Sequence, residues 1–571
     1  MILRKITLFS LLLTTGAVMA DDQDVIRINQ IGYFSQQEKV LVVDNIKPKS
    51  IVLMNEAGKK VAKLRPTRSA VSPFTGKTRY VVDFSKVVSP GQYVVNVDGR
   101  QTSVLVSDHP LKDLAKASVQ AFYMMRSGME IESSLAGKYA RPLGHPDIQV
   151  MIHPSAASPM RPAGMVIASP YGWYDAGDYN KYIVNSAFTI GMMLAVYEQI
   201  PDYFASLKLD IPERDNATPD LLDEIMYNIK WMLTMQDPYD GGVYHKLTTP
   251  NFEGFVMPAD CHQQRYVVQK SVTATLDFAA VMGQASRLFK GSPDYPGLSE
   301  QMIKAAEAAF AWAKDHPDAF YRQGMMNQRF QPAVNTGEYG DGFAKDEWFW
   351  AATQLALATG KTAYRDLALS NMPERFAVPV WGMLSGLGVY AWLASTDAAM
   401  ADKCKELLKA YADQALQNTA TSNFMAPFGD KPTDFGWGCL AESFCSPAVA
   451  LLFADRFIQS GKYRKDALRS LDYVLGRNPL GYCYVTGFGQ KSPLRPHQRL
   501  SAADGVDAPM PGLLVGGPNP GQQDKGSGLK YASSAPDESY LDLAESYASN
   551  EIAINWNASL VAVVCWLDAL M

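Results

Sequence analysis

The feature that most constrains the fold is a change in the spacing of apolar residues near Pro110. Before that point, short runs rich in Val, Ile and Tyr are separated by turn sequences such as Ser89-Pro90-Gly91. This spacing is typical of an all-β sandwich of Ig-like size. After Pro110, apolar residues recur at three- and four-residue intervals, which is the period of helices. The sequence therefore predicts a β-domain followed by a helical domain.

The predicted elements define the fold class. Strands are expected at Val25–Ile28, Val40–Val43, Ile51–Met54, Tyr80–Phe84, Gln92–Val97 and Ser103–Val106. Helices are expected at Leu111–Met125, Ala187–Gln199, Leu221–Met235, Val272–Phe289, Glu300–Lys314, Trp348–Ala358, Met383–Leu393, Ala401–Gln417, Ala448–Ile458, Tyr463–Val474 and Ile552–Leu570. Many are apolar on most of their circumference, so they pack on more than one side. We expect a multidomain chain: an all-β Ig-like sandwich (21–107), then an all-α (α/α)6 toroid (108–571).

The first residues resemble an export signal. Arg4 and Lys5 precede the apolar stretch Ile6–Leu13, and small residues around Ala20 suit cleavage. The stretch is too short to span a bilayer. We therefore expect a signal peptide over residues 1–20, a secreted or periplasmic protein, and no membrane association after cleavage.

Charge and cysteine content exclude other classes of protein. The 58 acidic residues exceed the 53 basic ones, giving a net charge of −5, which argues against a nucleic-acid partner. The six cysteines form no C-x-x-C pair, so neither a disulfide framework nor a thiolate metal site is indicated. Cys445 and Cys565 lie beside or within apolar helices and are expected to be buried thiols. The pairing of the cysteines stays open.

Three long segments between predicted helices are the expected location of the chemistry. They span residues 127–177, 238–271 and 478–550, and each is rich in Gly, Pro, aromatic and charged residues. Long loops in a compact domain usually carry function.

Asp175 and Asp178 form the first candidate site, at the end of the first long segment. With Gly177 between them, the two carboxylates can point to one spot and deprotonate a water molecule. Asp178 is expected at a helix N-terminus, which favours its anionic form. An N-cap at Asp178 and a turn residue at Asp175 fit the same spacing.

Glu551 is the second candidate, at the predicted start of the last helix. Beside Ile552 and Trp556, its carboxyl is expected to have a raised pKa and to serve as a proton donor. A first-turn Glu stabilised by the helix dipole is the alternative. The segment Arg495–Arg499 adds cationic groups and His497 in the third long segment.

Together these segments resemble glycoside hydrolase family 9, the inverting β-glucanases. Asp175-Ala176-Gly177-Asp178 resembles the family's DAGD signature. The family's C-terminal order is followed by Leu475–Gly481, Val485–Gly489, Pro496–Arg499, Gly512–Asn519 and Asn550-Glu551. The β-region, opening with Asn29–Tyr33, resembles the Ig-like module of one branch of the family. The resemblance covers nearly the whole chain after residue 20.

The resemblance implies direct displacement by water, for which no organic cofactor is needed. Asp178 would be the general base, Asp175 would help hold the water, and Glu551 would be the general acid. His497 and Arg499 match the family's sugar-binding residues. Other expected substrate contacts are Trp556, at a position where the family commonly has Tyr, and the platform candidates Trp173, Tyr174, Trp381 and Trp437, which as aromatic residues equally suit a core.

Two metal expectations also follow from the resemblance. Ser127 stands where related enzymes have a zinc-binding Cys, and residues 127–177 contain no Cys, so zinc is not expected. The segment Gly340–Trp348 resembles the family's calcium loop, with Asp346 and Glu347 as ligands of a structural Ca²⁺. A solvated acidic turn is the alternative.

The expected activity is hydrolysis of β-1,4-glucosidic bonds in cellulose or a related β-glucan by an endoglucanase. The alternative is an exo-acting enzyme of the same fold that releases glucose or glucosamine units, which the acidic segments Glu253–Asp260 and Asp504–Asp507 permit. A glycan receptor has no need of the three carboxyl groups, and no uronate lyase pair is indicated. The exact substrate, endo or processive action and the oligomeric state stay open. The Ig-like domain is expected to brace the toroid.

Overall fold

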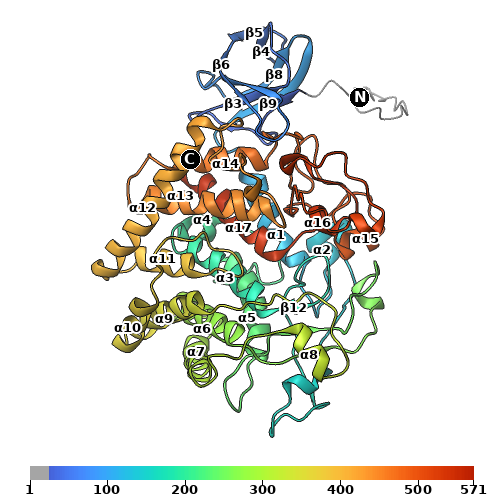
Figure 1. The fold of residues 1–571 in the computed structure, drawn as a ribbon, viewed down its shortest axis with the longest axis vertical. Helices are drawn as coiled ribbons and strands as arrows, with labels where there is room; N and C mark the ends of the chain where they lie inside the picture. Colours follow the sequence, from blue (N-terminus) through green and yellow to red (C-terminus); the bar gives the residue numbers. More distant parts are fainter. Residues whose placement is uncertain (1–24) are drawn as a thin grey trace, which may run out of the picture.

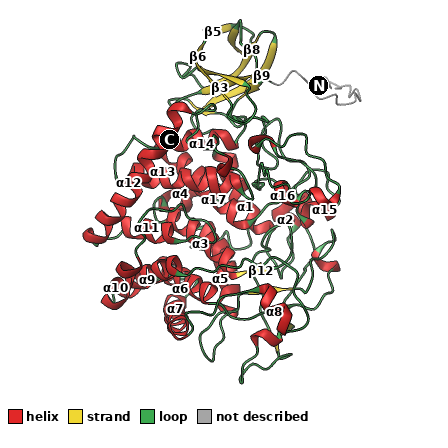
Figure 2. Ribbon diagram, in the orientation of Figure 1, coloured by secondary structure: helices red, strands yellow, loops and turns green. Residues whose placement is uncertain are grey.

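The computed structural model describes residues 25–571 and shows a small β-domain at one end of a larger helical body (Figure 1 and Figure 2). The predicted signal peptide lies outside these residues. Over the part described, no helix combines the length and apolar character needed to cross a membrane. All six cysteines, which lie within this part, have free thiols, and Cys445 and Cys565 are buried as expected.

Two sheets form the β-domain. One has the strand order β1-β3-β7-β6 and the other β2-β9-β8-β4-β5. All neighbours are antiparallel except β2 and β9. The strands are β1 (Ile26–Arg27), β2 (Tyr33–Phe34), β3 (Val40–Asp44), β4 (Ile51–Asn55), β5 (Lys60–Leu64), β6 (Pro66–Val71), β7 (Thr78–Asp83), β8 (Gly91–Val97) and β9 (Arg100–Ser107).

Strand β3 explains how the β-domain is attached. Its run of apolar residues is buried at every position, so both of its faces are covered. Leu41 and Val43 belong to the core between the two sheets, whereas Val40 and Val42 belong to the core of the helical domain. Since side chains alternate along a strand, one strand contributes to two cores. The β-domain therefore packs one face of β3, together with Val81 of β7, against the helical domain.

The helical domain begins with α1 (Lys112–Met124) and ends with α17 (Ile554–Leu570). Six largely buried helices follow one another along the described chain: α3 (Ile183–Tyr197), α6 (Val272–Leu288), α9 (Lys345–Thr359), α11 (Ser385–Leu393), α13 (Ser446–Phe457) and α17. They alternate with six helices that pack against them: α1, α5 (Asp220–Thr234), α7 (Leu298–Asp315), α10 (Thr362–Asn371), α12 (Ala398–Thr421) and α14 (Arg464–Val474). Shorter helices are α2 (Ser133–Ala136), α4 (Pro201–Ser206), α8 (Gln323–Arg329), α15 (Arg499–Ala503) and α16 (Tyr547–Asn550).

The helical domain is not purely helical, which corrects the all-α expectation. Its first two long segments contribute to a five-stranded sheet of order β11-β10-β14-β13-β12. The strands are β10 (Val150–Ile152), β11 (Val166–Ile167), β12 (Lys181–Tyr182), β13 (Lys246–Thr248) and β14 (Tyr266–Val267). Strands of two or three residues are too short to show an alternating pattern, so the sequence gives no signal for them.

Buried ions join the two domains. Arg79 on β7 is fully buried and pairs with Asp44 of the same sheet at 3.3 Å and with Asp537 of the third long segment at 3.4 Å. Gln30 also accepts hydrogen bonds from the backbone of Gln490 and Lys491 in that segment. The β-domain thus contacts the same long segment that carries the candidate residues His497 and Arg499.

Removing the buried cation should destabilise the protein strongly. Arg79→Met leaves the buried Asp537 carboxylate without an ion-pair partner and leaves Asp44 with Arg27 at 3.7 Å, so we expect the free energy of unfolding to fall by about 3–5 kcal/mol. The matched control is Lys77→Met. Lys77 forms an ion pair with Glu538 at 2.7 Å, and its side chain is 36% exposed. Exposed pairs contribute about 0–1 kcal/mol. Equal melting temperatures for the two variants would contradict this prediction.

Candidate active site

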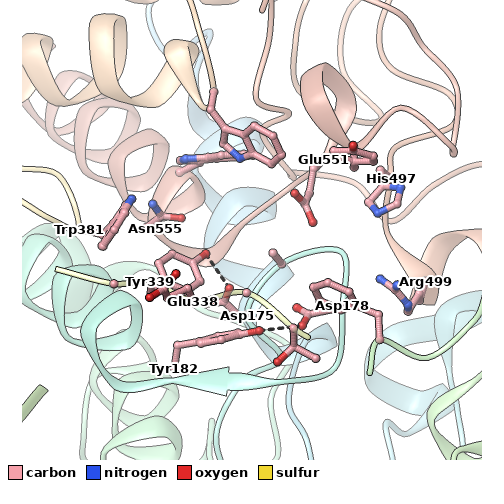
Figure 3. A pocket seen from close by; sticks show the side chains of 18 of the residues that line it. Asp175, Asp178, Tyr182, Glu338, Tyr339, Trp381, His497, Arg499, Glu551 and Asn555 are labelled. Atoms are coloured by element: carbon pink, nitrogen blue, oxygen red, sulfur yellow. Dashed lines mark hydrogen bonds between the residues drawn. The ribbon is translucent and has the colours of Figure 1, made fainter. Parts of the chain in front are cut away.

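A cavity of about 720 Å³ lies where the long segments meet (Figure 3). Its walls come from segments far apart in the chain: the Asp175–Asp178 turn, the loop before α9, and the C-terminal segments around His497 and Glu551. The side chains that shape it are Asp175, Asp178, Tyr182, Phe252, Glu338, Tyr339, Trp381, Trp437, Glu442, His497, Arg499, Tyr547, Glu551, Asn555 and Trp556.

Asp175 and Asp178 are buried and held by different partners. Asp175 accepts hydrogen bonds from Asn185 on α3 at 2.5 Å and from the Tyr339 hydroxyl at 2.7 Å. Asp178 accepts from the Asn180 amide at 2.5 Å and from the Tyr182 hydroxyl at 3.1 Å. Burial, followed by the charge of Asp178, raises the pKa of Asp175 to about 8. Two neighbouring acids that share one site do not both ionise easily.

The two tyrosines are reliable donors in this arrangement. Burial and the nearby aspartates raise the pKa of both Tyr182 and Tyr339 well above the ordinary value, so each hydroxyl keeps its proton. Their rings pack at 4.7 Å between centroids. The hydroxyls therefore fix the orientation of the Asp175 and Asp178 carboxyls (Figure 3).

Asp178 does not lie at a helix N-terminus, which corrects both interpretations of this residue made from the sequence. Residues Lys181–Tyr182 form β12, and α3 begins at Ile183 with Tyr182 as its N-cap. Asp178 is stabilised by side-chain donors and not by a helix dipole. The start of α3 could not be located from the sequence, because the two strand residues between the turn and this buried helix are too few to form a recognisable pattern.

Gly177 is required because other groups approach it closely. A Cβ at this position would lie 2.5 Å from the His497 carbonyl oxygen and 2.9 Å from Glu551 Oε1. The Gly177 amide donates to Glu551 Oε1 at 3.2 Å, and the Arg499 amide donates to the Gly177 carbonyl at 3.0 Å. The turn thus connects the two candidate segments directly.

Glu551 lies in an extended segment ahead of α17, which corrects its expected place at the start of the last helix and excludes the alternative of a first-turn Glu. It pairs with His497 in a parallel bridge, and α17 begins only at Ile554. The Ile554 amide donates to the Asp175 carbonyl at 2.9 Å, which fixes the segment against the aspartates. Burial, followed by the charge of Asp178, raises the pKa of Glu551 to about 8. Its carboxyl points toward the Asp175–Asp178 pair (Figure 3).

His497 and Arg499 line the same cavity but are already engaged. His497 Nδ1 donates to the Ala544 carbonyl at 2.5 Å, and burial lowers its pKa, so its imidazole is neutral. The Arg499 guanidinium donates to the carbonyls of Gly177 and Glu253, both at 2.7 Å. Arg499 therefore supports the shape of the site as well as facing the cavity.

The predicted aromatic platforms separate into two groups. Trp381, Trp437 and Trp556 line the cavity. Trp173 does not, because it is fully buried, packs on Phe122 and donates its indole N–H to Glu224 at 2.8 Å. Tyr174 is also buried, with its hydroxyl 3.0 Å from His145 Nδ1. These two expectations were wrong, because adjacent residues beside Asp175 turn into the core.

The sequence did not point to several other residues of the cavity. Glu338, Glu442 and Asn555 line it, and Glu442 lies on a short π-helix, Leu440–Cys445. Fully buried Lys246 donates to the Gly337 carbonyl at 2.6 Å behind the wall that carries Tyr339. Single Glu, Asn or Lys residues have no spacing that reveals them. The π-helix alone is a local signal, since such turns are frequent at functional sites.

Asp346 and Glu347 belong to a buried acidic cluster that also includes Asp277 and Asp341. Burial, and then the neighbouring acids, raises the pKa of Asp277 and of Glu347 well above the ordinary value. Five oxygens of these four carboxyls accept no hydrogen bond from the described residues. In the part of the chain described, no three His, Cys, Asp or Glu side chains lie close enough together to hold a metal ion as they stand. The donor chemistry suits a hard cation, which would have to draw the carboxylates together.

The cavity combines a proton donor with a pair of aspartates on the facing wall and with aromatic surfaces of the size of a sugar ring. Glu551 keeps its proton at neutral pH, and the aspartates can orient and deprotonate water. Such an acid and base cooperate in the hydrolysis of glycosidic bonds. Chemistry of this kind places the protein among the glycoside hydrolases.

Comparison with known proteins gives the family. Residues 112–564 match glycosyl hydrolase family 9, and residues 21–102 match the cellulase N-terminal Ig-like domain. The chain belongs to glycosyl hydrolase family 9, as the sequence motifs predicted.

Individual relatives match most or all of the chain. The chain is 52% identical to the xyloglucan-specific endo-β-1,4-glucanase BoGH9A of Bacteroides ovatus, covering 100% of this chain and 99% of the relative. It is 32% identical to endoglucanase D of Acetivibrio thermocellus, covering 94% and 82% of the two chains. A solved structure of Bacteroides ovatus GH9 superimposes with a TM-score of 0.92 at 51% identity, covering 96% of this chain and 99% of that chain.

Proposed function

We propose that this protein is an exported, inverting endo-β-1,4-glucanase that acts on xyloglucan or a closely related β-1,4-glucan. The observation that carries the proposal is the position of Glu551, whose pKa is raised to about 8, across the cavity from Asp175 and Asp178. A protonated acid and a pair of aspartates that can hold water are what single-step displacement requires.

Each residue then has a role in the reaction. Asp178 removes a proton from the attacking water, while Asp175, held by Tyr339 and Asn185, orients that water. Glu551 gives its proton to the leaving glycosidic oxygen. His497 and Arg499 contact the sugar at the reacting centre, and Trp381, Trp437 and Trp556 provide surfaces for pyranose faces. The reaction needs no organic cofactor.

The choice of substrate rests on the relative and on the cavity. BoGH9A, described as xyloglucan-specific, matches this chain over its whole length at 52% identity. A cavity of about 720 Å³ lined by three tryptophans also offers room for a branched glucan. The acidic segments Glu253–Asp260 and Asp504–Asp507, which permitted an exo-acting enzyme, contribute no carboxyl to the cavity wall. The exo-acting alternative is therefore no longer supported by these acidic segments.

The test is hydrolysis of xyloglucan, mixed-linkage glucan and carboxymethyl cellulose, followed by viscosity and by NMR of the first product. We expect viscosity to fall before many reducing ends appear, and the new reducing end to form first as the α-anomer. Release of single units without loss of viscosity would favour the exo-acting alternative. First appearance of the β-anomer would contradict inversion.

The helical ring and export of the enzyme are also part of the proposal. The alternation of six buried helices with six that pack on them supports a ring of helix pairs, the (α/α)6 toroid. Export is supported by the charged and apolar residues before Ala20. The oxidising compartment outside the cytoplasm would leave the buried cysteines unpaired, because their thiols are inaccessible.

We also propose that the acidic cluster holds a structural Ca²⁺. Asp346 and Glu347, together with Asp277 and Asp341, would be its ligands, and the unpartnered carboxylate oxygens support this assignment. A bound divalent cation would offset the repulsion among these four buried acids. The cation links α6 with the start of α9, beside the loop that carries Tyr339.

Calcium should therefore raise the melting temperature. Ligand binding to the folded state at 100 times Kd stabilises by about 2.7 kcal/mol, so chelation with EGTA should lower the melting temperature of a chain of this length by about 2 °C. Asp277→Asn should abolish most of the response to calcium. The control is Asp223→Asn, a carboxyl on α5 bonded to Tyr295, which should leave that response intact. A melting temperature that calcium and EGTA do not change would contradict the assignment.

A further inference from the structure

We propose that the glucan-binding surface continues beyond the cavity onto the loop Thr249–Cys261, where Phe252 and Phe255 form a stacking platform for a further sugar of the chain. The inference rests on the proposed function and extends it to the length of substrate that the enzyme binds.

Both rings are exposed, Phe252 in the cavity wall and Phe255 beside His497, which also lines the cavity. Phe252 is 46% exposed and lines the cavity, and Phe255 is 43% exposed. The Phe255 ring meets the His497 imidazole edge-on at 5.6 Å between centroids. The apolar surface is therefore continuous with the wall that carries the reacting groups.

Arg499 links the platform to the reacting centre. Its guanidinium carbon lies 5.5 Å from the Phe252 ring centroid and 5.8 Å from that of Phe255. The same guanidinium bonds the carbonyls of Glu253, between the two rings, and of Gly177. One cation thus fixes the rings relative to the Asp175–Asp178 turn.

The rest of the loop is anchored on the same elements. The Thr249 amide donates to Asn180 Oδ1 at 2.9 Å, and the Tyr179 hydroxyl donates to the Val256 carbonyl at 2.7 Å. The Asn335 amide donates to the Pro250 carbonyl at 2.7 Å. A platform held in place before the ligand arrives loses little conformational freedom on binding.

A glucan chain is the occupant that this surface fits. Exposed aromatic rings are unfavourable in water, and the apolar faces of a pyranose cover them while its hydroxyls stay hydrated. The chain in the cavity must leave through its mouth, and the platform adjoins the cavity wall. Among the described residues, the cation that lies over these rings is Arg499, which is already bonded to backbone carbonyls, so an anionic partner is not favoured.

The test compares kcat/KM on a series of glucan oligosaccharides of increasing length. Phe252→Ala and Phe255→Ala should each lower kcat/KM on the longest members by roughly three- to tenfold more than on the shortest. Phe255→Tyr should restore the preference for long substrates, whereas Phe255→Leu should not, because stacking needs a ring. Tyr239→Ala is the control, since Tyr239 is 57% exposed and does not line the cavity.

Equal losses at all lengths would overturn the proposal and indicate a structural role for the rings. A parent protein that hydrolyses no β-glucan at any length would instead refute the proposed function. Calorimetry on the Glu551→Gln variant separates the two results, because it measures whether affinity still grows with chain length and whether Phe255→Ala removes that growth.

Discussion

Glu551→Gln should lower kcat on β-glucans by about 10²–10⁴-fold, which is the usual contribution of a general acid. Glutamine keeps the shape of the side chain but has no proton to give to the leaving oxygen. An aryl glucoside oligomer with a dinitrophenolate leaving group needs no such proton, so we expect the variant to hydrolyse it within about tenfold of the parent rate. Initial rates on both substrates give the comparison.

The pH profile provides the second part of this prediction. The pKa of Glu551 is raised to about 8, so the carboxyl is protonated below that pH and loses its proton above it. Activity should therefore fall as the pH rises through about 8. The pKa of Asp175 is also raised to about 8, and the variant separates the two groups. If the fall in activity at alkaline pH persists in Glu551→Gln, the group that titrates is Asp175.

Asp178→Ala should have a comparably large effect, with a loss of about 10²–10⁴ in kcat, because the attacking water loses its base. The space left by the carboxyl lets a small anion reach the anomeric carbon, and azide needs no deprotonation. We therefore expect added azide to restore turnover partly and to give an α-glycosyl azide, which mass spectrometry and NMR identify.

Asn180→Ala is the matched control for this variant. Asn180 donates to Asp178 but does not line the cavity. Its loss should reduce activity without making the enzyme respond to azide. Activity of Asp178→Ala within tenfold of the parent protein would contradict the role of Asp178 as base.

Long amphipathic or apolar elements were predictable because their pattern repeats several times. The last helix was expected at Ile552–Leu570 and is observed at Ile554–Leu570. The helix Thr362–Asn371 was missed, since Ala368 alone is fully buried there and the apolar stripe is weak. Strands β5 and β6 were missed for a related reason, because most of their side chains are partly or fully exposed.

The candidate site was predictable where the sequence carries ordered motifs. Asp175, Asp178, His497, Arg499 and Glu551 all line one cavity. The sequence could not show which way their neighbours face. Trp173 and Tyr174 precede Asp175 directly, yet both enter the core.

The order of the domains, most of the helices and the residues able to donate or accept a proton could be predicted from the amino-acid sequence. Local periodicity and ordered motifs carry that information along the chain. The tertiary structure decided that Glu551 approaches Gly177, that Tyr339 and Tyr182 hold the two aspartates, and that the pKa of Glu551 is raised. Burial and charge proximity set these properties, and both depend on segments nearly 400 residues apart, whose contacts no local pattern records.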